Sequence, residues 1–189
     1  MPRLHEIIQT SLPPRETFAF IADFANSQAW DPGTVSSKRI GGTSVGAGTS
    51  YALTVKVGRG TAPMIYTIEI YEPDTRVVLR GDGASVTARD DIRFEPTADG
   101  GTKVDYNADI ELKGWKRLLT PFLGGAFRKL GDDARTGMTA ALAERAVRAE
   151  AARAETVARP EPAAFAEPEI RADAAADRES ATHAEPAVR

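Results

Sequence analysis

The segments 85–96, SVTARDDIRFEP, and 102–112, TKVDYNADIEL, alternate apolar and polar residues with a period of two. Successive side chains of a β-strand point to opposite faces of its sheet, so this period predicts two strands, each with one apolar and one solvated face. The turn residues at 98–101, ADGG, predict a hairpin between them. The predicted apolar faces hold Val86, Ala88, Asp90, Ile92 and Phe94 in the first strand, and Val104, Tyr106, Ala108, Ile110 and Leu112 in the second.

Asp90 is the exception on the apolar face of the first strand. An ionised carboxylate is costly to bury, so its position has two explanations. Either a β-bulge turns the side chain outward, which the neighbouring Asp91 would allow through a one-residue shift, or Asp90 is a functional acid. Both alternatives stand, and Asp90 is the candidate catalytic residue of the chain.

Further strands are predicted in the part of the chain before this hairpin. The segments rich in β-branched and aromatic residues, separated by Gly, Pro and Asp, are LHEIIQT from Leu4, 34–40, 48–58, 63–72 and 76–82. The glycines of 41–48, GGTSVGAG, resemble a phosphate-binding loop, but a strand rather than a helix follows them, so they predict a hairpin turn.

Helices are predicted at two places. Ser11, with Pro13 and Pro14 behind it, predicts the start of a short helix, and a second short helix or a turn fills 23–32, where Asp31 is expected to cap the turn. Thr120 and Pro121 predict the start of a long amphipathic helix that frays between Glu144 and Arg153. Its apolar stripe contains Phe127, Leu130, Ala134, Met138, Ala141 and Leu142. Together the elements predict an α+β fold: a seven-stranded antiparallel curved sheet wrapped around the last helix, with two short helices after the first strand.

Composition divides the chain into a domain at 1–150 and a tail at 151–189. In the tail 14 of 39 residues are alanine and few are large and apolar, which predicts a disordered extension. The tail carries five Arg and eight Asp plus Glu, of the chain's 24 basic and 27 acidic residues, so it is acidic and 1–150 is formally neutral with 19 of each sign. A neutral body disfavours a nucleic-acid partner, because phosphate binding relies on basic excess.

The residue types of the chain bear on metal and catalytic sites and on its location in the cell. The chain has no cysteine, and His5 and His183 are the two histidines, so we expect no metal centre, no Ser-His-Asp triad and no cofactor. There is no apolar run of about 18 residues and no signal-peptide core at the N-terminus, so we expect a cytoplasmic protein without stable membrane insertion.

Three parts of the sequence resemble the START-like, or SRPBCC, superfamily, in its polyketide cyclase/dehydrase and lipid transport branch. They are the strand and Pro-Pro helix from Leu4 to Trp30, the hairpin GGTKV at 100–104, and LKGWKRLLTPFLGGAFRKL at 112–130. The resemblance covers roughly residues 3–147. It implies a helix-grip (Bet v 1-like/START-like) fold, in which the long helix leaves a hollow against the bent sheet, and hollows of this kind are usual small-molecule sites.

The residues expected to line this hollow come from the short helices, the strands and the last helix. They are Trp30, Tyr51, Tyr66, Ile92, Tyr106, Phe127, Leu130 and Met138. Trp30 is either a core plug or the wall of the cavity mouth, and each tyrosine either packs in the core or directs its hydroxyl at a ligand. Arg80, Arg89 and Arg93 are expected on the solvated face of their strands, with a ligand role as the alternative.

Two functions follow from this hollow. The first is non-catalytic binding or transport of a small hydrophobic molecule such as a lipid, an isoprenoid or a polyketide-like aromatic, because the chain lacks the usual catalytic groups. The alternative is a polyketide cyclase, aromatase or dehydratase in which Asp90 or a tyrosine exchanges protons with the substrate. A third hypothesis is an interaction module with a regulatory tail. The ligand and the oligomeric state are left open.

Overall fold

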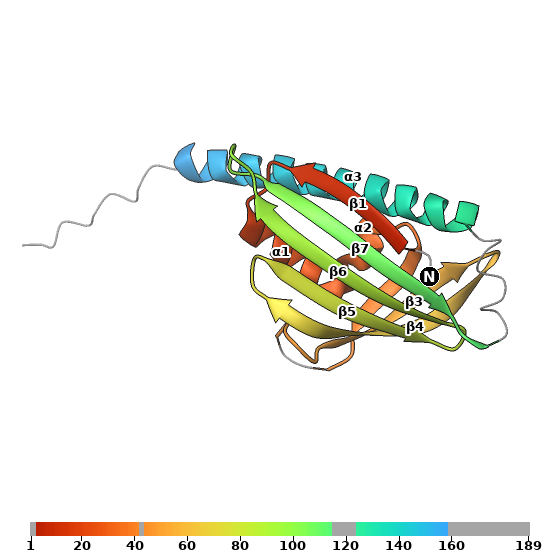
Figure 1. Ribbon diagram of the computed structural model, residues 1–189. Coiled ribbons are helices and arrows are strands. Elements are labelled where there is room, and N and C mark those ends of the chain that lie inside the picture. Colours follow the sequence, from red (N-terminus) through yellow and green to blue (C-terminus); the bar gives the residue numbers. More distant parts are fainter. Residues whose placement is uncertain (1–2, 42–43, 115–123, 159–189) are drawn as a thin grey trace, which may run out of the picture.

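Seven antiparallel strands form one curved sheet in the order β1-β7-β6-β5-β4-β3-β2. The computed structural model describes residues 3–41, 44–114 and 124–158. Figure 1 shows the sheet curling around the helices, which confirms the predicted fold class. The strands are β1 Arg3–Thr10, β2 Thr34–Arg39, β3 Ser50–Val57, β4 Gly60–Glu72, β5 Arg76–Gly83, β6 Val86–Pro96 and β7 Thr102–Leu112.

The hairpin of β6 and β7 has the register that its alternation predicted. The two strands pair without interruption from Val86 opposite Leu112 to Pro96 opposite Thr102. Gly100 adopts a φ of 84° in the connecting turn, a conformation that favours glycine. β6 also pairs with β5 without a register shift, so no bulge turns Asp90 outward, and its side chain lies on the buried face.

Three short helical elements connect β1 to β2 on the concave side of the sheet. They are α1 Pro14–Ala22, the 3-10 helix η1 Phe24–Asn26 and α2 Ser27–Trp30. α1 begins three residues later than Ser11 suggested, because Pro13 is the N-cap and Pro14 occupies the first turn, where a missing N–H costs nothing. The Asp23 side chain accepts a hydrogen bond from the Ala25 amide and so caps η1.

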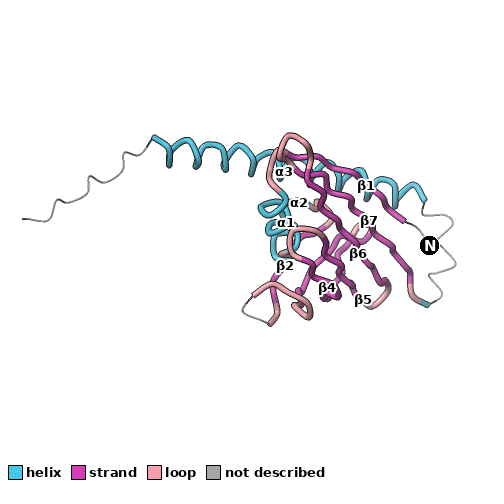
Figure 2. Tube along the Cα trace, turned by 60° about the vertical axis from the view of Figure 1, so that its left-hand side comes forward, coloured by secondary structure: helices cyan, strands magenta, loops and turns pink. Residues whose placement is uncertain are grey.

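The long helix α3 spans Gly124–Ala158 and lies along β1 and α2 (Figure 1). Its buried face includes Ala134, Met138, Ala141 and Leu142. The expected N-cap pair Thr120-Pro121 lies outside the described residues. At the other end the sequence predicts a helix that frays by Arg153, and the structure corrects this: α3 continues to Ala158 and passes beyond the sheet (Figure 2).

The continuation of α3 has a physical reason in its sequence. The segment 151–158, AARAETVA, is rich in alanine, the residue with the highest helix propensity, and the Arg153 guanidinium pairs with Glu16 of α1. Of the described helices, none is long and apolar enough to cross a membrane.

Candidate functional site

A carboxyl group and a phenol meet on the concave face of the sheet. Asp90 on β6 is 4% exposed, and its Oδ1 accepts a hydrogen bond of 3.2 Å from the Tyr106 hydroxyl on β7. Tyr106 pairs with Ile92 across the two strands, so the phenol reaches Asp90 diagonally on the same face. Period-two alternation in both strands therefore places the two groups together, with Ala88, Ile92, Val104 and Ala108 as buried neighbours.

Burial changes the acidity of Asp90. The pKa of Asp90 is raised to about 7: loss of hydration is the largest cause, the hydrogen bond from Tyr106 opposes the change, and the nearby Asp31 and Asp109 carboxylates add to it. A carboxyl with this pKa is populated both as acid and as base near neutral pH. Asp90 can therefore donate a proton to a guest molecule or accept one from it.

Two tyrosines supply hydrogen-bond donors beside this acid. The pKa of the Tyr66 hydroxyl and that of the Tyr106 hydroxyl are both raised well above 10, by burial first and then by the Asp90 charge. Both phenols therefore stay protonated. The Tyr66 ring lies directly over Gly81 of β5, where a Cβ would come within 2.6 Å of the ring Cζ atom. Glycine at this position lets the Tyr66 ring lie flat against the sheet.

Asp31 follows α2 and adds negative charge near the two tyrosines and Asp90. Its Oδ1 accepts a hydrogen bond from the Gly33 amide and its Oδ2 accepts one from the Thr34 hydroxyl, both at 2.8 Å. These bonds make Asp31 the turn-capping carboxylate that its Asp-Pro-Gly context predicted.

Trp30 is 2% exposed and lies in the middle of an aromatic cluster. Its ring centroid is 5.5 Å from that of Phe24 and 6.4 Å from that of Tyr106, edge to face in both pairs. The Trp30 indole N–H has no hydrogen-bond partner within the described part of the chain. Trp30 is thus buried as a core residue would be, and its indole N–H is available as a hydrogen-bond donor.

The other predicted lining residues differ in how deeply their side chains are buried. Ile92 and Met138 are fully buried, and Leu130 is partly buried beside Gly33. Tyr51 is buried next to Phe24, and burial, followed by the Asp23 carboxylate, raises its pKa. The side chain of Phe127 lies outside the described residues.

The strand arginines lie on the opposite, solvated face. Arg80, Arg89 and Arg93 are about half exposed and pair with Asp82, Glu69 and Asp91 at 3.0, 3.3 and 3.6 Å. They do not join Asp90. Exposed ion pairs of this kind contribute little to stability, at about 0–1 kcal/mol each.

Two groups that matter for the site were not identified from the sequence. Gly81 carries no signal of its own, because its role depends on the β4–β5 register that sets it opposite Tyr66. Phe24 connects Trp30, Tyr51 and Tyr66 through ring contacts, whereas the helical pattern of the sequence gives it no such role.

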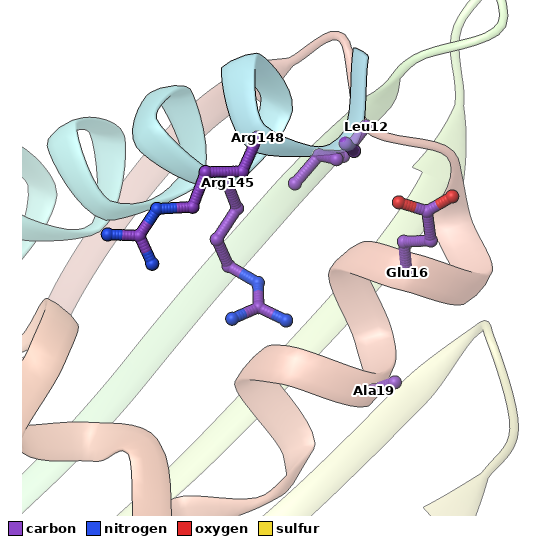
Figure 3. Close-up of a pocket in the computed structure, with 6 residues that line it drawn as sticks. Leu12, Glu16, Ala19, Arg145 and Arg148 are labelled. Carbon is purple, nitrogen blue, oxygen red and sulfur yellow. The ribbon is translucent and has the colours of Figure 1, made fainter. Parts of the chain in front are cut away.

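Asp90 does not line either of two hollows described in the structure. One, of about 400 Å³, opens between α1 and the later part of α3 (Figure 3), and the Arg145 guanidinium at its side lies 4.2 Å from the centre of the Phe20 ring. It is lined by Leu12, Glu16, Ala19, Arg145, Arg148 and Ala149. The other, of about 310 Å³, is lined mainly by charged residues of the outer face, among them Glu69, Arg80, Arg89 and Glu111. The cavity predicted between α3 and the sheet stays a prediction.

No three His, Asp or Glu side chains gather at one point in the parts of the chain that the structure describes. The Asp90 carboxyl accepts its described hydrogen bond from the Tyr106 phenol.

Solved structures share this architecture at low sequence identity. The Thermus thermophilus protein TTHA0849 superposes with a TM-score of 0.64 at 16% identity, over 78% of this chain and 99% of its own. A START superfamily protein from Mycobacterium smegmatis gives 0.61 at 14% identity, over 78% and 98%. DR_A0006 from Deinococcus radiodurans gives 0.57 at 15% identity, over 77% and 98%. Similarity at this level establishes the fold alone.

A family model supplies the assignment that these structures cannot. No curated protein matches the chain. The model described as polyketide cyclase / dehydrase and lipid transport matches residues 1–159, which include every described strand and helix. The chain therefore belongs to the polyketide cyclase / dehydrase and lipid transport family, within the SRPBCC, or START-like, superfamily that its sequence resembles.

Proposed function

We propose that this protein binds or carries a small, mainly apolar molecule between the concave face of the sheet and α3. The observation that carries the proposal is the polar cluster of Asp90, Tyr66 and Tyr106 on a face that is otherwise apolar. Burying a carboxyl group costs stability, and a fold that needed only a packed core would be served by an apolar residue at position 90. Family membership supports a ligand-binding role in general.

The proposed site divides its contacts between the two ends of a guest. Ile92, Met138 and the Trp30 ring offer apolar surface to the body of the molecule. Asp90 and the Tyr66 hydroxyl offer hydrogen bonds to one polar group, because the single O–H of Tyr106 already donates to Asp90. A few polar groups in an apolar setting are typical of small-molecule sites, where they set orientation and specificity.

The proposal is tested by purifying the full chain without removing lipids and identifying bound molecules by native mass spectrometry. Ala108 is buried beside Asp90 on the paired strand, so Ala108→Leu would occupy space at the site. Asn107→Leu, on the other face of the same strand, is the matched control. We expect a small molecule to accompany the wild type and Asn107→Leu but to be depleted in Ala108→Leu. Absence of any bound molecule in all three proteins would contradict the proposal.

Cyclase or dehydratase activity is a second candidate, and the inward position of Asp90 favours it. In such a reaction the Asp90 carboxylate would take a proton from the carbon next to a ketone, while a tyrosine O–H donates a hydrogen bond to the ketone oxygen as it becomes an enolate. The enolate carbon would then attack a second carbonyl of the same molecule, and the Asp90 acid would return its proton to the new alkoxide oxygen.

The first step of this chemistry can be measured without the natural substrate. An aromatic 1,3-diketone in deuterated water exchanges its central protons, and NMR gives the rate. We expect the protein to accelerate the exchange, Asp90→Asn to remove the acceleration, and the neighbouring outward variant Asp91→Asn to retain it. Equal rates for the wild type and Asp90→Asn would exclude Asp90 as the base and leave the binding role alone.

A further inference from the structure

We propose that the interior site selects its guest by charge: it accepts an apolar molecule whose polar end is a neutral hydroxyl, ketone or ester, and it rejects one that ends in a carboxylate. This inference rests on the proposed binding function and adds the chemical class of the guest.

The first argument is the sign of the charges around the site. Among the buried residues that the structure describes, Asp90 is the one acidic or basic side chain, and no Lys or Arg is buried there. Asp31, near Asp90 and the two tyrosines, is also acidic. Two like charges in a medium that water does not screen repel strongly. A carboxylate guest beside Asp90 would have to enter as the protonated acid or force Asp90 to hold its proton.

The second argument is where the cations are. The guanidinium groups of β5 and β6 lie on the solvated face in pairs with carboxylates, and Arg39 pairs with Asp23 at 3.1 Å. On α3, Arg135 pairs with Glu6, and Arg145 lies over the Phe20 ring. A guest carboxylate at Asp90 would find none of these charges as a partner.

The third argument concerns the hydrogen-bond donors, which taken alone would favour an anion. The Trp30 indole N–H is unpartnered in the described part of the chain, and the Tyr66 hydroxyl stays protonated, whereas the O–H of Tyr106 already donates to Asp90. Such donors also bind the oxygen of a neutral ketone, ester or alcohol, although more weakly than they bind an anion. The Asp90 carboxyl therefore decides the selectivity, and removing its charge should relax the rejection of anions.

The test uses three naphthalene probes that share one fluorescent body: naphthol, methyl naphthoate and naphthoate. At about pH 8.5 the Asp90 carboxyl, with its pKa of about 7, is mostly ionised, and we expect the full chain to bind the alcohol and the ester about tenfold or more tightly than the carboxylate. Asp90→Asn keeps the size of the side chain but removes its charge, so it should bring the carboxylate to within about threefold of the ester. Asp91→Asn, on the solvated face, should keep the wild-type ratio.

Each outcome of this series is decisive. Naphthoate binding to the interior of the wild type as tightly as the ester would overturn the inference, and so would an unchanged ratio in Asp90→Asn. Failure of all three probes to bind would contradict the proposed function itself, and the selectivity with it. If all three probes bind and naphthoate binds as tightly as the ester, the proposed binding function stands and the charge selectivity is excluded.

The groove between α1 and α3 provides a necessary control, because Arg145 and Arg148 line it and could hold a carboxylate on the outside (Figure 3). Any naphthoate binding is therefore repeated with Arg145→Ala. If the substitution abolishes that binding while ester binding persists, the anion sits in the outer groove and interior rejection holds. If naphthoate binding survives in Arg145→Ala and falls in the Ala108→Leu variant, the anion occupies the interior, and an affinity there equal to that of the ester overturns the inference.

Discussion

Asp90 and Asp91 are neighbours in sequence, yet their side chains have opposite electrostatic surroundings. Burial raises the pKa of Asp90 to about 7, whereas the Arg76 guanidinium, bonded to both Asp91 oxygens at 2.9 and 2.7 Å, lowers the pKa of Asp91. The sequence shows two adjacent acids and does not say which one is buried. Register decides this, because a shift of one residue would exchange their faces.

This contrast predicts opposite effects of pH on stability. The folded pKa of Asp90 lies above its unfolded value of about 4, so its contribution to folding is full below about pH 4 and is lost as pH rises through 7. Asp90→Asn cannot ionise. Between about pH 4 and pH 8 the free energy of unfolding of the wild type should fall relative to Asp90→Asn, on the order of 2–4 kcal/mol. Urea unfolding at several pH values measures this difference.

Asp91→Asn is the matched control for that titration. The pKa of Asp91 is lowered, so its stabilising contribution is present above its unfolded pKa of about 4 and is lost as pH falls. The variant should therefore be less stable than the wild type near pH 8, with the difference disappearing in acid. A wild type and Asp90→Asn that respond identically to pH would show that the Asp90 carboxyl is hydrated.

Gly81 supports a second prediction about single residues. An added Cβ would meet the Tyr66 ring at 2.6–2.9 Å, so Gly81→Ala should displace that ring and lower the free energy of unfolding by about 1–3 kcal/mol. Gly46→Ala is the control, since nothing lies within 4 Å of its added Cβ. Denaturant unfolding compares the two. Equal stability of Gly81→Ala and the wild type would mean that the ring does not rest on the sheet.

Among the secondary-structure elements, the contact of α3 with α2 positions the long helix over the sheet. At Gly137 an added Cβ would lie 2.5 Å from the Trp30 carbonyl oxygen and 2.8 Å from the Pro32 ring. The nearest obstacle is backbone, which cannot rotate away as a side chain can. The absence of a side chain at Gly137 therefore lets α3 pack directly on the turn that carries Trp30 and Asp31.

A pair of glycine substitutions in α3 tests this contact. Alanine is preferred over glycine inside a helix by about 1 kcal/mol, yet Gly137→Ala should destabilise the protein by about 1–3 kcal/mol, because the helix must move away from α2. Gly125→Ala meets nothing within 4 Å and should be neutral or slightly stabilising. Thermal unfolding of both variants measures the difference. A stabilising Gly137→Ala would show that α3 packs loosely.

Across the complete fold, the sequence predicted the sheet and its long helix because period-two and helical patterns are local. It could not decide the direction of Asp90, which depends on the absence of a bulge along two described strand pairs. It missed the role of Gly81, which depends on pairing with a distant strand. It also placed the end of α3 too early, because low apolar content was taken as disorder where alanine favours a helix.

The boundary of the folded unit is a related proposal. The family match ends at residue 159 and α3 at Ala158, so we expect deletion of 159–189 to leave the free energy of unfolding and probe binding unchanged. A cut after residue 150 removes Arg153, which pairs with Glu16, and should be slightly less stable. Urea unfolding of the two truncated chains distinguishes these boundaries. A large loss on removing 159–189 would assign that segment to the fold.

The proposed function requires the space between α3 and the sheet to receive a guest that contacts Asp90. The decisive measurement is a crystal structure of the full chain, purified without removing bound lipids. We predict density for an apolar molecule against Ile92 and Met138, with a polar atom within hydrogen-bond distance of Asp90 or Tyr106. Side chains that fill this space, with no density for a guest in crystals grown with and without methyl naphthoate, would contradict the proposal.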